Sequence, residues 1–232
     1  MDDIRASNPA SNPALFAKAA EFLIGKKFDL RELMRAILQS ETYQRSSVAL
    51  AENKADTRFY SRYYPRRLMA EVALDAVSQV TRIPTLLETD VRNANQAKGT
   101  AYPMGWRAIQ LPDANIANTF LKSFGSPARE VTCECERTAE PNVAQALHLS
   151  NGDTVNQKLA AKDSIVAQAL ASGKPVAQLV EDAYLAALAR LPTAGERERF
   201  EKVLGDEKDG KDTLLADVYW ALLSSREFLF NH

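Results

Sequence analysis

Cys133 and Cys135 are the residues whose type and spacing most directly suggest chemistry. They are separated by one glutamate, and in an extended segment residues two apart share a face. Such a pair can give two thiolates to a soft metal ion, but further ligands are needed, and the sequence has only His148 and His232 as histidines. The two cysteines can also form a strained, easily reduced disulfide, or remain independent thiols. We regard them as a disulfide or thiol pair and predict no metal site.

The segment 58–67 interleaves arginines with aromatic residues and contains no acid. Aromatic rings stack on bases or sugars, and a guanidinium binds phosphate or carboxylate through a planar fork. The candidate ligand-binding residues here are Arg62, Tyr63, Tyr64, Arg66 and Arg67. The structural alternative is that the aromatic residues anchor the segment in the core, while the arginines pair with Glu71 and Asp75. The balanced charge of the chain favours this alternative over a site for an anionic polymer such as an acidic glycan.

A second cluster, within residues 129–140, mixes arginines with glutamates. Arg129 and Arg137 complete the set of candidate ligand-binding residues. Two carboxyl groups can act as the acid and base of a glycosidase when their surroundings push their pKa values apart. The glutamates available for such a pair are Glu130, Glu134, Glu136 and Glu140. Because arginines are abundant beside them, we favour a structural ion-pair network over catalysis.

His148 lies between two leucines on a predicted helix. A nucleophilic site built on it would need a nearby serine or cysteine and a third, orienting group. The sequence contains no nucleophile-elbow glycine pattern, no phosphate-cradling glycine loop and no Cys-x-x-Cys-His haem motif. We therefore expect a half-buried histidine bonded to a backbone carbonyl, no catalytic residue and no cofactor.

The composition excludes several classes of protein. The chain has 232 residues, with 29 Lys and Arg against 30 Asp and Glu, and 46% hydrophobic residues. A chain of this length forms one large domain or two small ones and buries a core without help from a metal or disulfide. The near-zero net charge argues against a nucleic-acid partner. No apolar run reaches the roughly 18–20 residues of a membrane-spanning helix.

Helical periodicity and capping residues indicate helices on both sides of a central segment. Asn12 or Ser11 is expected to cap the first helix, Asp29 the second, and the capping box Thr193–Glu196 a later one. The expected helices are 13–25, 30–38, 66–82, 116–124, 141–149, 153–173, 176–188, one after Glu196 and a final one from Asp212.

Residues 85–137 differ from the rest, because glycines and prolines recur there and periodicity fails. Arg107–Leu111 is the one alternating segment that fits a strand. We predict an all-α, mainly helical fold with an orthogonal or bundle-like arrangement. Residues 1–232 are expected to form a single domain in which 83–140 make an irregular, insert-like layer.

A series of motifs runs in order along essentially the whole chain. They are 2–9 with 11–13, Phe28–Leu33, Ser40–Ser47, Tyr63–Leu68, Gln110–Asp113, Phe124–Arg129, Cys133–Arg137, Gln145–Leu149 and Trp220–Leu223. With these motifs the chain resembles the planctomycete-specific domain of unknown function 1553. The family's domain usually starts with an earlier aromatic-rich helical stretch, so this chain looks like an N-terminally truncated copy.

The resemblance implies the C-terminal part of a larger exported, periplasmic or cell-envelope protein that often carries cytochrome-c-like domains. It carries over no catalytic residue, and we expect a non-enzymatic scaffold or interaction module. Its partners would be other domains of the same polypeptide or a protein, bound by the irregular middle segment. One alternative is a carbohydrate-active module that binds or hydrolyses acidic polysaccharide. Another is a redox or electron-transfer accessory that uses Cys133 and Cys135.

Overall fold

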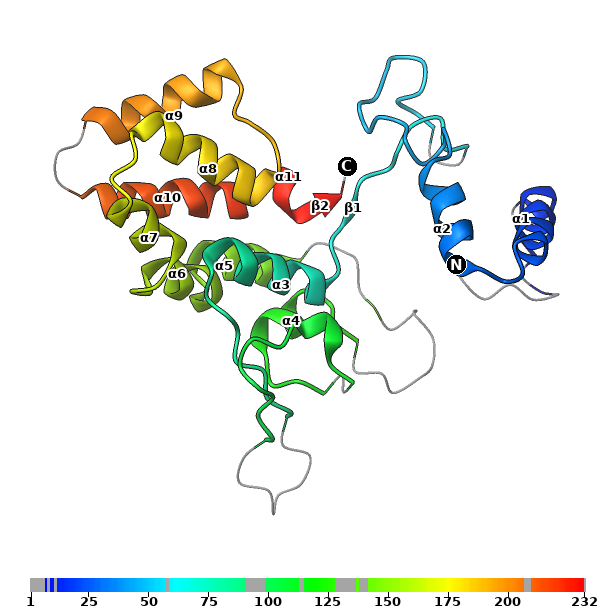
Figure 1. The fold of residues 1–232 in the computed structure, drawn as a ribbon, viewed down its shortest axis with the longest axis horizontal. Helices are drawn as coiled ribbons and strands as arrows, with labels where there is room; N and C mark the ends of the chain where they lie inside the picture. Colours follow the sequence, from blue (N-terminus) through cyan, green and yellow to red (C-terminus); the bar gives the residue numbers. More distant parts are fainter. Residues whose placement is uncertain are drawn as a thin grey trace. The chain divides into compact units, whose positions relative to one another are not determined.

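The structure is a computed structural model that describes residues 7, 9–10, 12–56, 59–90, 99–112, 115–127, 137, 142–206 and 210–231. Within these ranges the chain is mainly α-helical (Figure 1), which confirms the predicted fold class. The strands found there, β1 (Arg66–Arg67) and β2 (Phe230–Asn231), pair in one small sheet. None of the helices in these ranges is both long enough and apolar enough to cross a membrane.

The chain divides into two compact units, one within residues 1–66 and one formed by Arg67–Asn231. This division does not decide whether residues 1–232 form the single domain that we expected, so the single domain stays a prediction. The insert-like character of 83–140 also stays a prediction. Each unit is described separately below.

The N-terminal unit contains helices α1 (Pro13–Gly25) and α2 (Leu30–Leu38), which contact each other. The Asn12 side chain accepts a hydrogen bond from the Leu15 amide at 3.1 Å, and Asp29 accepts from Arg31 and Glu32 at 2.9 and 3.3 Å. Both helices therefore begin where their capping residues predict. None of the described residues of this unit is fully buried.

The helix expected to begin at Arg66 begins later. Helix α3 is Ala70–Thr81, with Met69 as its N-cap, whereas Arg66–Arg67 form strand β1. The reason is a partner distant in sequence: β1 pairs with β2, and the Leu68 amide donates to the Leu229 carbonyl at 2.9 Å. These bonds satisfy backbone hydrogen-bonding groups of residues 66–68, so this segment is stable without forming part of a helix.

The central segment contains the 3-10 helix η1 (Ala108–Gln110) and helix α4 (Thr119–Ser123). The strand predicted for Arg107–Leu111 is wrong, because Asp75 on α3 accepts hydrogen bonds from the Ala108 and Ile109 amides at 2.7 and 3.1 Å and holds a tight turn. Helix α4 is shorter than the expected 116–124, since Asn118 caps it through the Leu121 amide.

Helix α5 (Val143–Asn151) is followed by α6 (Asp153–Ala160) and α7 (Ile165–Ala171). One helix was expected over 153–173, but the chain breaks after Ala160. Ser164, which is 1% exposed, restarts the helix because its hydroxyl accepts from the Ala167 amide. The break lets α7 contact α10 as well as α6.

The last helices are α8 (Val176–Leu188), α9 (Ala194–Asp206), α10 (Lys211–Leu223) and α11 (Arg226–Leu229). The capping box before α9 is confirmed by the Glu196 carboxylate, which accepts from the Thr193 amide at 2.8 Å, and by the return bond from the Glu196 amide. Helix α10 was expected to be the final one; Ser225 caps the short α11 beyond it. Helix α10 packs against α6, α8 and α9 (Figure 1).

Two hydrophobic clusters form the core of the C-terminal unit. The larger one joins α3 and α6–α11 around fully buried side chains such as Leu215, Tyr219 and Leu223. The smaller one joins α3, η1 and α4 around Leu74 and Phe120. Since α3 contributes to both clusters, it links the central segment to the C-terminal helices.

Candidate functional site

The predicted arginine–aromatic segment begins in the N-terminal unit. The Arg62 guanidinium lies 5.0 Å from the centroid of the Tyr64 ring, and the Tyr60 and Tyr64 centroids are 5.6 Å apart. Tyr63 makes an edge contact with Tyr43 at 6.3 Å between centroids. Arg62, Tyr63 and Tyr64 therefore each contact an aromatic ring of the same unit. The cation–π contact between Arg62 and Tyr64 stabilises this arrangement modestly.

The loop before Arg62 is held by the Asp56 carboxylate. It accepts hydrogen bonds from the Phe59 and Ser61 amides at 2.8 and 3.0 Å, and from the Ser61 hydroxyl at 2.5 Å. Phe59 is nonetheless 80% exposed. The expectation that the aromatic residues anchor this segment in a core is thus wrong for Phe59, whose ring lies in solvent.

Arg67 and Arg137 lie in the C-terminal unit, near the start of α3. The Arg67 guanidinium donates to the Phe124 carbonyl at 3.0 Å and lies over the Phe124 ring. Arg137 donates two hydrogen bonds to Glu71, at 2.8 and 3.4 Å, and the Ser126 hydroxyl donates a third at 2.8 Å. Burial works against ionisation of Glu71, but the bonds from Arg137 and Ser126 hold its pKa below the ordinary value.

The structure shows which arginines contact the two acidic residues of α3. Glu71 binds Arg137, and Asp75 lies 3.6 Å from Arg107 while it also accepts the η1 amides. The expected pairing of Glu71 and Asp75 with arginines of segment 58–67 is therefore wrong for the described arginines, because Arg137 and Arg107 from the central segment bind these acids instead.

The predicted site residues are divided between the two units and the part of the chain outside the described residues. Arg62, Tyr63 and Tyr64 belong to one unit, and Arg67 and Arg137 to the other, while Arg66 is exposed on β1. Arg129, Cys133 and Cys135 lie outside the described residues, as do the four glutamates of the second cluster. Their role as a ligand site stays a prediction.

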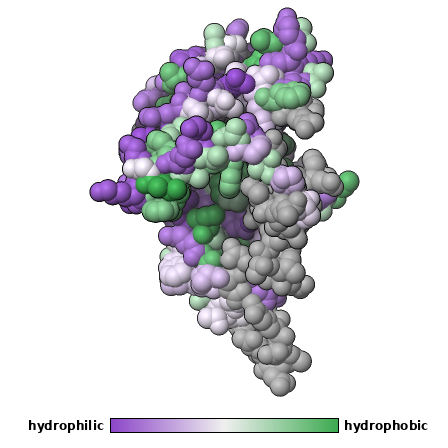
Figure 2. Space-filling model, turned by 90° about the vertical axis from the view of Figure 1, so that its right-hand side faces the viewer, coloured by the Kyte–Doolittle hydropathy of each residue, from purple (hydrophilic) through white to green (hydrophobic). Residues whose placement is uncertain are grey.

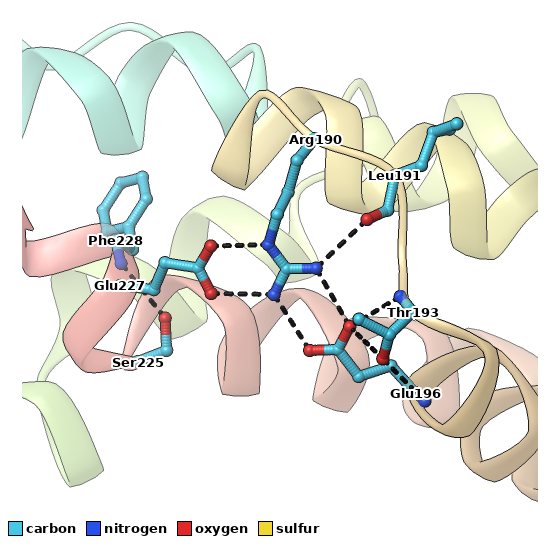
Figure 3. A network of polar contacts seen from close by, with 7 residues as sticks. All are labelled: Arg190, Leu191, Thr193, Glu196, Ser225, Glu227 and Phe228. Atoms are coloured by element: carbon cyan, nitrogen blue, oxygen red, sulfur yellow. Dashed lines mark hydrogen bonds and ion pairs between the residues drawn. The ribbon is translucent and has the colours of Figure 1, made fainter. Parts of the chain in front are cut away.

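A charge network connects α8, α9 and α11 (Figure 3). Arg190 donates to both oxygens of Glu227, at 2.5 and 2.8 Å, and to both oxygens of Glu196, each at 2.9 Å. These bonds raise the pKa of Arg190 above its ordinary value and lower the pKa of Glu196 to about 2. All the acceptors of this guanidinium are carboxylates or the Leu191 carbonyl, so the network is structural rather than a binding site.

His148 is half-buried, as expected, but its partner differs. Its Nε2 atom lies 2.9 Å from the Thr154 hydroxyl, where a backbone carbonyl was expected. The ring also makes edge contacts with Phe120 and Phe124. Burial lowers the pKa of His148, while the nearby Asp153 opposes that shift. The imidazole therefore ties the end of α5 to the start of α6.

Sequence reasoning missed Lys158, a buried lysine on α6. Its side chain is 7% exposed, and its Nζ donates to the Ile83 carbonyl at 2.5 Å. Lys158 lines a pocket of about 360 Å³ together with Thr85, Asn118 and Thr154. The available signal was its position beside Leu159 and three residues after Val155, which places a charged residue on the buried face of a helix.

A larger pocket, of about 670 Å³, lies among α6, α7 and α10, and Trp220 forms part of its wall. Asp212 and Asp217 line it, but both are exposed to solvent. Among the described residues there is no group of three or more His, Cys, Asp or Glu side chains that could hold a metal ion.

Large apolar side chains are exposed on the N-terminal helices. On α2 the exposed side chains Leu30, Met34, Ile37 and Leu38, together with the partly buried Leu33, form an apolar stripe. Met34 is 60% and Leu30 59% exposed. On the face shown in the space-filling view, hydrophobic and hydrophilic side chains of the coloured residues are interspersed (Figure 2). A continuous stripe on one helix is therefore more informative than single exposed apolar residues.

Comparison with known proteins identifies the family. The sequence model of the family described as PSD1, protein of unknown function (DUF1553), matches residues 1–204 of the chain. The chain belongs to this family. For DUF1553 the description assigns no activity, so the family relationship leaves the function of the chain unknown. Neither the curated proteins nor the solved structures contain a significant match.

Proposed function

We propose that this DUF1553 chain is a non-enzymatic interaction module and that the apolar stripe of α2 is its docking surface. The observation that carries the proposal is the exposure of that stripe on a well-capped helix. An amphipathic helix normally buries its apolar face against a core, and such a face left in water marks a binding surface. We place the docking surface on α2, whereas the surface expected from the sequence in the irregular middle segment stays a prediction.

The charges around the stripe define the chemistry of the partner. Residues 13–38 contain five Lys or Arg and three Asp or Glu. The partner surface is accordingly an apolar helix face flanked by acidic side chains, because opposite charges at the rim of an interface favour association. It is part of another domain of the same polypeptide or of a separate protein. The proposal also includes that the chain is part of a larger, exported planctomycete-type protein.

The carbohydrate and redox alternatives receive no support from the described residues. Of the candidate ligand-binding arginines, Arg67 donates to a carbonyl and Arg137 to a carboxylate, which leaves both less suited to an acidic glycan. The redox alternative depends on Cys133 and Cys135, outside the described residues. The interaction module is therefore the function we put forward.

Site-specific photo-crosslinking in the native host tests the proposal. A photoreactive phenylalanine at Met34 samples the stripe, and the same residue at Ala36, on the other side of α2, is the control. We expect Met34 to crosslink to another domain or protein with an acidic, apolar helix, at least several-fold more than Ala36. Crosslinks no stronger than those from Ala36, or crosslinks confined to residues 67–231 of the same chain, would overturn the proposal.

A second variant separates binding from folding. Replacing Ile37 with Glu puts a charge in the stripe without removing a buried side chain, since Ile37 is half exposed. We expect loss of the crosslinked complex together with unchanged helicity. The matched variant Ala36→Glu should retain the complex. Equal effects of the two substitutions would show that the stripe does not determine binding.

A further inference from the structure

Lys158 is a buried amine without an acidic partner. An ammonium group has three N–H donors, whereas the acceptor of Lys158 in the described chain is the single Ile83 carbonyl at 2.5 Å. Other lysines of this unit are paired differently: Lys122 and Lys174 each contact a carboxylate at 2.5 Å. Burying a charged amine without a counter-charge is costly, so the protein environment shifts the protonation equilibrium of Lys158 toward the neutral amine.

Lys158 and Ile83, the residue to whose carbonyl its amine donates, both line one pocket. The pocket, of about 360 Å³, is lined by Thr85, Asn118, Thr154 and Gln157, which supply hydroxyl and amide groups, and by the Asp153 carboxylate. Its volume lies at the lower end of the range for small-molecule sites, which is several hundred Å³. The lining is therefore suited to a small ligand that carries hydroxyl or carbonyl oxygens.

We infer that Lys158 is the nucleophile of a covalent binding site for small polar aldehydes or ketones. The neutral amine attacks the carbonyl carbon, and the carbonyl oxygen takes up the π electron pair and a proton to give a carbinolamine. Loss of that oxygen as water leaves an imine, so one C=N bond replaces one C=O bond and no oxidant or reductant is consumed. The protonated imine retains one N–H, which can still donate to the Ile83 carbonyl.

The lowered proton affinity of the Lys158 amine is consistent with its role as a nucleophile in this pocket. Burial lowers its pKa from 10.5 to about 8. At neutral pH a much larger fraction of this amine is unprotonated than of an ordinary exposed lysine, roughly three hundredfold more. The lower basicity reduces the intrinsic nucleophilicity in part, and we therefore expect a net gain in reaction rate of about tenfold over an exposed lysine.

Reductive trapping on the full chain tests the inference. The folded protein is incubated with glycolaldehyde and cyanoborohydride at pH 7, and the resulting secondary amines are mapped by mass spectrometry. Lys162, which is exposed just beyond the end of α6, is the internal control. We expect Lys158 to be labelled about tenfold faster than Lys162, and this preference to vanish in urea. Labelling of Lys158 at or below the rate of Lys162 in the folded chain would overturn the inference.

A pocket-filling variant tests whether the reaction takes place in the pocket. Gln157 is exposed at the rim, and Gln157→Trp narrows the entrance while Lys158 and its bond to Ile83 remain. We expect labelling of Lys158 to slow several-fold and labelling of Lys162 to stay constant. Asn156→Trp, on the neighbouring exposed position outside this pocket, is the matched control. An unchanged Lys158 rate in Gln157→Trp would contradict a site in this pocket.

Discussion

Arg190 is the residue on which the junction of α8, α9 and α11 depends. Its guanidinium serves two carboxylates and stacks over the Tyr184 ring, with the charged atom 5.2 Å from the ring centroid. Its side chain is 34% exposed, so solvent screens part of the interaction. We expect Arg190→Met to lower the free energy of unfolding by about 1–3 kcal/mol, because Glu196 and Glu227 are left facing each other without a cation.

Urea unfolding, followed by far-UV circular dichroism, measures this loss. Arg199→Met is the matched control, since Arg199 is an exposed arginine on α9, and its loss should cost no more than about 0.5 kcal/mol. Similar costs for the two variants would contradict a structural role for the Arg190 network.

The pKa of Glu196 predicts a pH dependence. It is lowered to about 2 in the folded chain, from an ordinary value of 4.5, by the hydrogen bonds from Arg190. A depressed carboxyl pKa stabilises the folded state above pH 4.5, and that stabilisation is lost as the pH falls toward 2. The difference in unfolding free energy between the wild type and Glu196→Gln should therefore be constant from pH 7 to 5 and shrink below pH 4.5. A difference that does not change down to pH 2.5 would refute the assignment.

At the scale of elements, the corner between α5 and α6 requires glycine. The Gly152 amide donates to the His148 carbonyl at 2.8 Å, and a Cβ at Gly152 would lie 2.1 Å from that same oxygen. Because the obstacle is backbone, Gly152→Ala has to displace one of the two helices. We expect a loss of about 2–4 kcal/mol in unfolding free energy.

Gly195→Ala provides the comparison in the first turn of α9. No atom lies within 4 Å of a Cβ built at Gly195. Alanine is the better helix former, so this variant should gain up to about 1 kcal/mol. Thermal unfolding of the two variants should thus shift in opposite directions. A destabilised Gly195→Ala or a neutral Gly152→Ala would show that the steric argument is wrong.

At the scale of the whole molecule, the hydrophobic core lies in one of the two units. Every residue of both clusters comes from the part after Arg67, and none of the described residues before it is fully buried. We therefore expect a fragment of residues 65–232 to fold alone and to unfold cooperatively, as a chain with its own core does. Urea denaturation of this fragment, compared with the full chain, measures its stability; a fragment without a cooperative transition would contradict the expectation.

The same comparison addresses the single domain predicted from the sequence. If residues 1–66 form part of one domain with the rest, the midpoint of the fragment should fall well below that of the full chain. If they form a separate module, as the proposed docking function requires, the two midpoints should agree closely.

Local signals in the sequence were sufficient for much of the helical structure. Asn12, Asp29 and the Thr193–Glu196 capping box each begin a helix as predicted, because a cap acts within four residues of itself. The family resemblance was likewise available from motifs in order along the chain, and the family match confirms it.

Contacts between distant residues decided the rest. Arg66–Arg67 are extended because they pair with β2, which lies at the other end of the chain. Arg107–Leu111 form a turn because Asp75 accepts hydrogen bonds from the Ala108 and Ile109 amides. The burial of Lys158 became interpretable only once Ile83 and a polar pocket were seen beside it. Periodicity and caps are properties of neighbouring residues and can be read along the chain. Pairing, burial and proton affinity depend on which segments meet in space, and only the folded chain determines that.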